Sequence, residues 1–319
     1  MIPEIRPYRD GDTELVVRVG NAAWPDHPMT VEELRFNDAN WDPKCRHARF
    51  VAEEGDQVIG VGNYGQFPDM YHPRKFYIEI SVHPDRHRQG IGSALYAHLC
   101  NVLQPFDPLS LRAWVLETYP SCLAFYQKRG VVEDMRLWES ILDLGTFDFT
   151  SYESLTKRLE GEGFLIHSLH ELESDPERNR KIFNLLEEVM SDVPYPEEHT
   201  EMSFEYFEKD FQSPNLLPDG YLLMVCGEEY VGISNLWRFA VASDFQQGIT
   251  GVRRVYRRRG IALALKLAGI RYAREQGKHR IRTNNEIGNR PMLTLNEKLG
   301  FVRQPAWISL RKRLQGSST

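Results

Sequence analysis

Hydrophobic and polar residues follow each other along the chain in an order that occurs twice. A strand-like run at 75–82, apolar at every second position, ends in a basic turn with glycines that opens into helix-spaced apolar residues at 90–103. A second such turn precedes a helical pattern at 260–276, and Gly90 and Leu95 recur there as Gly260 and Leu265. Recurrence at a constant offset indicates an internal duplication.

The remaining periodicities complete two similar halves. In the first half we expect strands at 2–8, 49–53, 57–64, 75–82, 109–116 and 131–144, and helices over 15–22, from Thr30, at 90–103 and at 119–130. In the second half we expect strands at 164–169, 220–227, 230–241, 279–284 and 302–313, and helices at 175–189, 260–276 and 289–299. The predicted fold class is α/β of mixed α+β type. Each half has a mostly antiparallel twisted sheet flanked by helices, with one βαβ crossover at the turn.

The duplication predicts two domains, and 319 residues are enough for both to bury a core. We place an N-terminal domain at 1–145, a connecting segment at 146–162 and a C-terminal domain at 163–319. The connecting segment has apolar residues at helical spacing and lacks the Gly/Ser composition of a flexible linker. We therefore expect it to pack against a domain.

Composition excludes several classes of function. The chain is 41% hydrophobic and 26% charged, as in globular proteins, and its net charge of −6 argues against a nucleic-acid partner. Its four cysteines lack metal-ligand spacing, so we predict no metal site and reduced thiols. No signal peptide and no run of 18 apolar residues is present. We predict a cytoplasmic monomer or homodimer without a membrane partner.

The two glycine turns have the layout of a phosphate cradle. The first turn of a helix has unpaired N–H groups and a partial positive charge, which together favour a bound pyrophosphate. Gly90 and Gly92 let the backbone approach such a ligand, while Arg88, or Arg257 to Arg259 in the second copy, adds charge. The alternative interpretation is an ordinary βα turn with solvated arginines.

Several motifs resemble one enzyme family. These are Val-x-Pro-x-x-x-Arg-Gln-Gly-Ile-Gly-Ser at 82–93, Ala-Phe-Tyr-x-Lys-x-Gly at 124–130, Arg-x-x-Gly-x-Ala at 257–262 and Asn-x-x-Met-Leu-x-x-Asn-x-x-Leu-Gly-Phe at 289–301. The motifs and the order of elements resemble the GNAT superfamily of acyl-CoA-dependent N-acetyltransferases. The duplicated layout is similar to that of proteins with two tandem GNAT domains.

The resemblance implies acetyl-CoA as co-substrate and a set of backbone and side-chain contacts in both halves. In the first half these are Ile80, Ser81, Val82, His87, Arg88, Gln89, Gly90, Ile91, Gly92 and Ser93. In the second half they are Thr250, Gly251, Val252, Arg257, Arg258, Arg259, Gly260, Ile261, Ala262, Asn289 and Asn296. Two positions of the first half depart from the family pattern. His87 replaces a glutamine or arginine, and Tyr119 replaces an asparagine that the second half keeps as Asn289.

Catalysis requires a base, because only a neutral amine attacks a thioester. Glu79, on the strand that enters the first turn, is our candidate, and Glu117 is a weaker one. The resemblance places Tyr126 near the cofactor sulfur, where a phenol suits the departing thiolate, whereas its counterpart is Asn296. Glu79 is alternatively a solvated charge on the strand face, and Tyr126 alternatively a core residue. We assign the chemistry to the first half and expect two acetyl-CoA sites of unequal affinity.

The acceptor is expected to contact proline-broken segments after the first helix of each half. These segments mix aromatic and acidic groups, including Trp24, His27, Met29 and Trp41 in the first half and Tyr195, Glu197 and Phe207 in the second. Such a mixture favours a cationic amine through charge and cation–π contact. We predict an N-acetyltransferase that acts on a primary amine of a small molecule by direct attack. Two alternatives stay open, a non-catalytic acetyl-CoA-binding sensor or scaffold and an acetyltransferase of protein lysines or N-termini.

Overall fold

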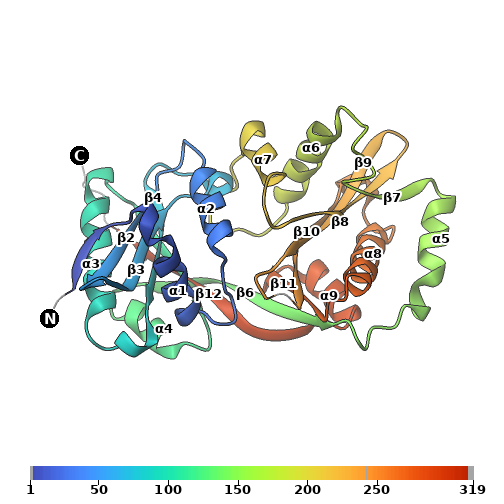
Figure 1. Cartoon of the computed structure of the whole chain (residues 1–319). Coiled ribbons are helices and arrows are strands. Elements are labelled where there is room, and N and C mark those ends of the chain that lie inside the picture. Colours follow the sequence, from blue (N-terminus) through green and yellow to red (C-terminus); the bar gives the residue numbers. More distant parts are fainter. Residues whose placement is uncertain (1–2, 242, 315–319) are drawn as a thin grey trace. The chain divides into compact units, whose positions relative to one another are not determined.

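The chain forms two compact units in the computed structural model, which describes residues 3–241 and 243–314 (Figure 1). Unit 1 contains 3–136, 195–201 and 306–314, and unit 2 contains Leu137–Pro194 and Met202–Pro305. A short internal segment and the end of the chain therefore belong to the unit built mainly from the first half. The predicted domain boundaries at 145 and 163 refer to the two repeated halves of the sequence, and they stay a prediction.

Unit 1 is a sheet covered on both faces. Its elements are β1 (Glu4–Pro7), α1 (Thr13–Ala23), α2 (Val31–Ala39), β2 (Ala48–Glu54), β3 (Gln57–Gly65), β4 (Lys75–Val82), α3 (Ile91–Leu103), β5 (Ser110–Leu116), α4 (Pro120–Gln127) and the ends of β6 (Val132–Asp143) and β12 (Val302–Arg313) that lie in this unit. The strand order β1-β2-β3-β4-β5-β12 is antiparallel except at β4 and β5. Side chains of α3 pack on one face, and those of α1 and α2 pack on the other.

Unit 2 repeats this plan. Its elements are α5 (Glu153–Gly161), β7 (Phe164–Ser168), α6 (Arg178–Met190), α7 (Phe204–Asp210), β8 (Leu216–Cys226), β9 (Glu229–Arg238), β10 (Asp244–Val252), α8 (Ile261–Glu275), β11 (Arg280–Glu286), α9 (Arg290–Lys298) and the rest of β6 and β12. The strand order is β6-β11-β10-β9-β8-β7, and β10 and β11 are the parallel pair. The α8 side chains pack on one face and those of α6 and α7 on the other. The predicted mixed α/β fold is confirmed in both units.

The last strand of each half lies in the sheet of the other half. In unit 1, β12 pairs with β5 from Trp307 opposite Leu116 to Arg313 opposite Ser110. In unit 2, β6 pairs with β11 from Leu137 to Asp143. Both strands are 12 residues long. Each of the two strands is long enough to form the edge of either sheet. The hydrophobic pattern alone therefore does not indicate which sheet each strand joins.

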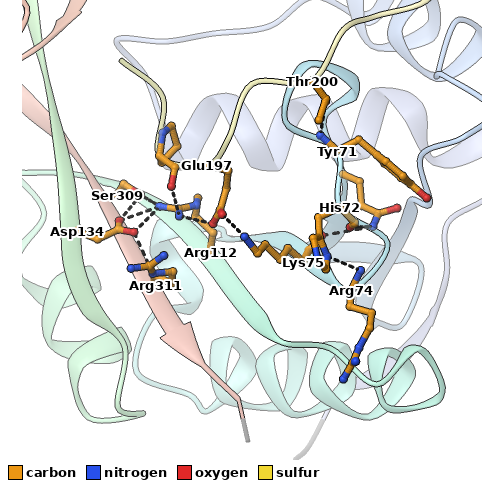
Figure 2. A network of polar contacts seen from close by, with 12 residues as sticks. Tyr71, His72, Arg74, Lys75, Arg112, Asp134, Glu197, Thr200, Ser309 and Arg311 are labelled. Carbon is orange, nitrogen blue, oxygen red and sulfur yellow. Dashed lines mark hydrogen bonds and ion pairs between the residues drawn. The ribbon is translucent and has the colours of Figure 1, made fainter. Parts of the chain in front are cut away.

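A segment of the second half is held on unit 1 by partly buried charges. Residues 195–201, between α6 and α7, place Glu197 where it accepts hydrogen bonds from Arg112 Nη2 at 2.7 Å and Lys75 Nζ at 2.6 Å (Figure 2). Thr200 Oγ1 donates to the carbonyl of Pro68 at 2.8 Å. Charge-assisted bonds of this kind hold the segment in a single position on unit 1. Glu197 was predicted among the acceptor contacts, and its carboxylate is bonded to Arg112 and Lys75 of unit 1.

Local rules explain where most elements begin and end. The Thr30 hydroxyl caps α2 by accepting from the Glu33 amide at 3.1 Å, at the start that was predicted for this helix. In the predicted helix at 175–189, α6 begins only at Arg178 because the Asp175 carboxylate accepts from the Glu177 amide at 2.9 Å and forms a turn. The predicted packed helix of the connecting segment is α5, whose Leu159 is buried.

The duplication extends to the closest contact between sheet and helix. A Cβ on Gly60 of β3 would lie 2.9 Å from Ile91 Cγ2, and a Cβ on Gly232 of β9 would lie 2.9 Å from Ile261 Cγ2. Such distances are well inside van der Waals contact. Glycine at both positions therefore lets α3 and α8 rest directly on their sheets, and this fixes where the two turns lie.

Candidate active site

The turn between β4 and α3 has the backbone geometry of an anion cradle. Arg88 and Gly90 have left-handed φ values of +64° and +86°, so the chain reverses sharply before α3 begins at Ile91. A Cβ on Gly90 would meet no atom within 4 Å, which leaves the amides of the first helical turn accessible. His87 Nε2 donates to the Val82 carbonyl at 3.0 Å and closes the turn. Arg88 makes no hydrogen bond or ion pair with the described residues.

A cavity of about 540 Å³ lies between this turn, β4 and α4. The parallel pairing of β4 with β5 covers only Lys75–Tyr77 in the described part of the chain, and beyond it the two strands separate. The cavity occupies that wedge, with Ile80 to Val82 on one side and Trp114 and Val115 on the other. We call it the cofactor cavity.

Nine of the ten cofactor residues predicted for the first half line this cavity. They are Ile80, Ser81, Val82, His87, Arg88, Gly90, Ile91, Gly92 and Ser93. Gln89 is the exception, since its amide nitrogen donates to the Asp85 carbonyl at 3.4 Å within the turn. The sequence motif therefore describes a continuous surface in unit 1.

A second cavity, of about 520 Å³, lies between β3, β4 and the helices α1 and α2. All four aromatic, histidine and methionine residues singled out in the first half line it, namely Trp24, His27, Met29 and Trp41. We call it the acceptor cavity. Trp24, Glu79 and Ser81 line both cavities, so these three residues mark the place where the two spaces meet.

Glu79 is placed at that junction and its environment makes it a stronger base. The side chain is accessible from the cavities but lies deep among protein atoms, and this burial raises the pKa of its carboxyl above the ordinary value. A hydrogen bond from Asn63 Nδ2, 3.3 Å long, and the charge of Arg49 act in the opposite direction. Burial has the larger effect.

Glu117, the weaker candidate, is placed differently. Hydrogen bonds from the Ala306 amide at 3.2 Å and from Arg136 Nη1 at 2.8 Å lower the pKa of Glu117. Its carboxylate is therefore a poor proton acceptor. Glu117 also lines neither of the two cavities described above.

Tyr126 lies on α4 and lines the cofactor cavity. Its ring is 6% exposed and packs edge-on against Phe125 and Tyr96. Burial, followed by the nearby charge of Glu79, raises the pKa of Tyr126 well above the ordinary phenol value. The phenol therefore keeps its proton and acts as a hydrogen-bond donor. Tyr126 is thus a core residue that also lines the cavity, and its role beside the cofactor sulfur stays a prediction.

The turn between β10 and α8 in unit 2 has the same backbone shape. Arg258 and Gly260 have φ values of +67° and +90°, and Arg257 Nε donates to the Val252 carbonyl at 3.0 Å, as His87 does in unit 1. Arg258, like Arg88, makes no ion pair with the described residues. The duplicated sequence thus produces two nearly identical turns.

The second turn is covered, however, by residues without a counterpart at the first. A Cβ on Gly260 would lie 2.8 Å from Leu155 Cδ1 of α5, and Arg158 of the same helix donates to the Arg259 carbonyl at 2.6 Å. Ile261 is buried beneath the turn, and Ala262 packs against the same core. Helix α5 therefore occupies space that is open above Gly90.

Three arginines around the second turn, Arg253, Arg254 and Arg257, are paired with carboxylates within unit 2. Arg254 and Arg257 both bind Asp192, at 2.7 and 2.5 Å, and these hydrogen bonds hold the pKa of Asp192 at about 2. Arg253 is paired with Glu188 at 2.7 Å. Of the arginines predicted to hold the pyrophosphate there, Arg257 is therefore committed to a carboxylate.

Strand β10 and helix α9 also differ from their counterparts. A Cβ on Gly251 would lie 2.1 Å from Val189 Cγ1, so the end of α6 rests directly on the strand. Thr250 Oγ1 lies 3.0 Å from Ser234 Oγ, Asn289 caps α9, and Asn296 is buried with Nδ2 donating to Asn285 Oδ1 at 2.6 Å. Asn296, the counterpart of Tyr126, is thus committed to a neighbouring side chain.

Several lining residues were not predicted. Arg129 donates to Ser93 Oγ at 2.8 Å and lies over the Phe125 ring at 3.7 Å, and Lys128 also lines the cofactor cavity. Trp24 and Ser81 were both predicted, but not the hydrogen bond that Trp24 Nε1 donates to Ser81 Oγ at 3.1 Å. A helix-spaced pattern does not distinguish such residues from solvated ones. The basic end of α4, beside the Ala-Phe-Tyr motif, was a signal for the first two.

Comparison with known proteins agrees with this geometry. The sequence matches the acetyltransferase (GNAT) family over residues 14–131 and again over 180–301. A tandem GNAT protein from the clavulanic acid biosynthesis pathway has a similar structure, with 21% identity, a TM-score of 0.75 and 99% of each chain covered. A GCN5-related N-acetyltransferase from Sphaerobacter thermophilus shares 19% identity, with a TM-score of 0.69, and covers 98% of this chain and 97% of its own. No curated protein matches the sequence.

A duplicated sheet with a glycine cradle at each crossover is the architecture of a tandem GNAT fold. The chain belongs to the acetyltransferase (GNAT) family, with one GNAT region in each half. This family generally uses acetyl-CoA, and its fold supports acyl transfer. No helix in the described ranges, 3–241 and 243–314, is both long and apolar enough to cross a membrane.

Proposed function

We propose that the protein transfers the acetyl group of acetyl-CoA to a primary amine of a small molecule, and that the reaction takes place in unit 1. The observation that carries this proposal is that Trp24, Glu79 and Ser81 line both the cofactor cavity and the acceptor cavity. A donor held in one space and an acceptor held in the other would meet beside a carboxylate. That arrangement favours direct attack over an acyl-enzyme route.

The first turn supports pyrophosphate binding. The open amides of the first turn of α3 and the unpaired Arg88 supply hydrogen bonds and positive charge. Ile80 to Val82, no longer paired with β5, offer backbone groups to the pantetheine arm. The covered second turn keeps the same backbone but requires α5 to move. We therefore propose a tight site in unit 1 and a weaker one in unit 2.

The proposed chemistry uses two side chains. Glu79 accepts a proton from the ammonium of the acceptor, and its raised pKa makes it a better base than an exposed glutamate. The neutral amine then attacks the thioester carbonyl, and a C–N bond forms. The nitrogen loses its second proton to solvent, the C–S bond breaks, and coenzyme A leaves as a thiolate that takes up a proton from solvent. Tyr126 donates a hydrogen bond to the departing thiolate. Full transfer of its proton would be uphill, because a phenol near 10 is a weaker acid than a thiol near 8.5.

The test is a thiol-release assay with acetyl-CoA and a panel of amines and peptides. We expect release with small primary amines and a matching acetylated product by mass spectrometry. Release with lysine peptides alone would identify a protein acetyltransferase and contradict the proposed acceptor. Tight acetyl-CoA binding without release from any amine or peptide would identify a sensor or scaffold and contradict the proposed reaction.

A further inference from the structure

Resting on the proposed function, we infer that the acceptor is a primary amine on an apolar or aromatic body that carries no carboxylate near its amino group. The inference comes from the charges that line the acceptor cavity. Three carboxylates line it, Asp10, Asp38 and Glu79, against a single permanent cation, Arg49. The space therefore attracts an ammonium and repels an anion.

The one cation is already fully committed. Arg49 Nη1 and Nη2 bind the two oxygens of Asp38 at 2.6 and 3.0 Å, and Arg49 Nε donates to Asn63 Oδ1 at 3.2 Å. Guanidinium groups bind carboxylates through pairs of N–H groups on one edge. The N–H groups of Nη1 and Nη2 are bonded to Asp38. The other edge of the guanidinium includes Nε, which is bonded to Asn63. No edge remains for the carboxylate of a substrate.

His47, one of the two histidines that line the cavity, does not supply the missing charge. His47 packs against Trp41 in a tilted arrangement with 4.4 Å between ring centroids, and burial lowers the pKa of His47. Its imidazole is neutral near pH 7. His27 packs edge-on against Trp307 at 5.0 Å, so its ring is a wall of the cavity.

Arg49 also affects the proposed base, Glu79, because the two residues share Asn63 as a hydrogen-bond partner. Because Asn63 Oδ1 accepts from Arg49, the amide is oriented with Nδ2 toward Glu79, to which it donates at 3.3 Å. This bond uses one oxygen of Glu79, and the carboxylate stays available to a substrate ammonium. The walls around it are mostly rings and aliphatic chains, among them Tyr8, Trp24, Trp41 and Tyr77. Such walls suit an aralkylamine, whose cation also gains from the ring faces.

The inference is tested with three matched acceptors, phenethylamine, phenylalaninamide and phenylalanine. We expect kcat/KM for phenethylamine and phenylalaninamide to agree within about tenfold, and phenylalanine to be lower by about 100-fold or more, because its carboxylate would be buried without a partner. Equal rates with phenylalanine and phenethylamine would overturn the inference. A deficit shared by phenylalaninamide and phenylalanine would also overturn it, because bulk rather than charge would then be excluded.

Two variants sharpen the test by changing one charge each. Asp38→Asn releases the Arg49 fork and should raise the phenylalanine to phenethylamine ratio by about tenfold, the value of roughly one hydrogen bond to a charged group. Asp10→Asn adds the same charge without releasing Arg49 and should leave that ratio within about twofold. Equal ratios in the two variants would contradict the role of the committed fork. Thermal melting checks that both variants fold, and the comparison of the three acceptors in the wild type stands without them.

The outcome is separable from that of the proposed function. If no amine is acetylated, the reaction proposed above fails, and calorimetric binding of the three compounds to the acetyl-CoA-loaded protein still tests the ligand class. Binding of phenethylamine with weaker binding of phenylalanine would support the inference even then. Binding of phenylalanine alone, or of none of the three compounds, would overturn it.

Discussion

The first and second turns share a backbone but differ in what surrounds them. Both place an arginine and a glycine in left-handed conformations, and both rest on a glycine that brings the helix close to the sheet. Above Gly90 the space is open, whereas above Gly260 it is filled by Leu155 and Arg158. A duplicated motif thus preserves the geometry for anion binding, while the elements packed around it decide whether the site is accessible.

The same contrast holds for the chemistry next to each turn. Unit 1 has Glu79 at the junction of two cavities and Tyr126 on the wall of one. In unit 2 the end of α6 rests on β10, and Asn296 is bonded to Asn285. The following variants test whether these differences separate a catalytic unit from a structural one.

The largest effect is expected at the base. Glu79→Gln keeps the shape of the side chain but cannot accept a proton, so kcat/KM should fall by about 10² to 10⁴, the usual contribution of a general base. Steady-state kinetics with varied amine concentration at saturating acetyl-CoA measure the loss. Glu117→Gln is the matched control and should change the rate little, because Arg136 already holds that carboxylate. A larger loss in Glu117→Gln would reverse the assignment.

The next effect concerns the departing thiolate. Tyr126→Phe should lower kcat by about 10- to 150-fold, since a hydrogen bond to a charged group contributes about 1.5 to 3 kcal/mol. The Michaelis constant for acetyl-CoA should stay nearly unchanged, because the bond forms mainly in the transition state. Asn296→Ala serves as the comparison from unit 2. Full activity in Tyr126→Phe together with lost activity in Asn296→Ala would place catalysis in the other unit.

A smaller, directional effect is expected in the pH profile. On the acidic limb of the profile, kcat/KM should fall as Glu79 becomes protonated. Because burial raises the pKa of Glu79, this fall should occur at a higher pH than for an ordinary glutamate. Asn63 stabilises the charged form by donating to it, so Asn63→Ala should move that limb to still higher pH. Asn235→Ala, at the equivalent strand position in unit 2, should leave the limb in place. A downward shift in Asn63→Ala would show that Glu79 is not the titrating group.

The smallest effect tests whether α5 limits access to the second turn. Arg158→Ala removes the hydrogen bond to the Arg259 carbonyl and should tighten the weak acetyl-CoA site about 2- to 10-fold, the value of one ordinary hydrogen bond. Lys157→Ala, an exposed change on the same helix, is the control. Calorimetry measures both constants. An unchanged weak site in Arg158→Ala would mean that other contacts keep the turn closed.

Local sequence patterns predicted much of the molecule. Alternation and turn residues predicted β4 at Lys75–Val82 and β12 at Val302–Arg313 with the bounds that the structure has. They also predicted the two turns, because left-handed positions next to a helix start favour glycine. The choice of strand partner was not predictable in this way, since β6 and β12 offer similar edges to either sheet.

Long-range packing accounts for the rest of the candidate site. The residues predicted for the second cradle are the right types in the right order, but Asp192 and Leu155 are distant in sequence and fill its surroundings. Likewise, the sequence shows Arg49 only as a basic residue at the start of a strand. In the structure its guanidinium is paired with Asp38. Periodicity shows which face a residue lies on but not which partner it meets there.

The most direct test of a tight acetyl-CoA site in unit 1 is calorimetric titration of two matched variants, Gly90→Asp and Gly260→Asp. Each puts a carboxylate at a left-handed position of one cradle, with a similar backbone cost of about 1 kcal/mol. Gly260→Asp must in addition displace Leu155, so it is the more disruptive change of the two. We predict that Gly90→Asp loses the tight site while Gly260→Asp retains it, with folding of both checked by circular dichroism. Retention of the tight site in Gly90→Asp and its loss in Gly260→Asp would contradict the assignment to unit 1.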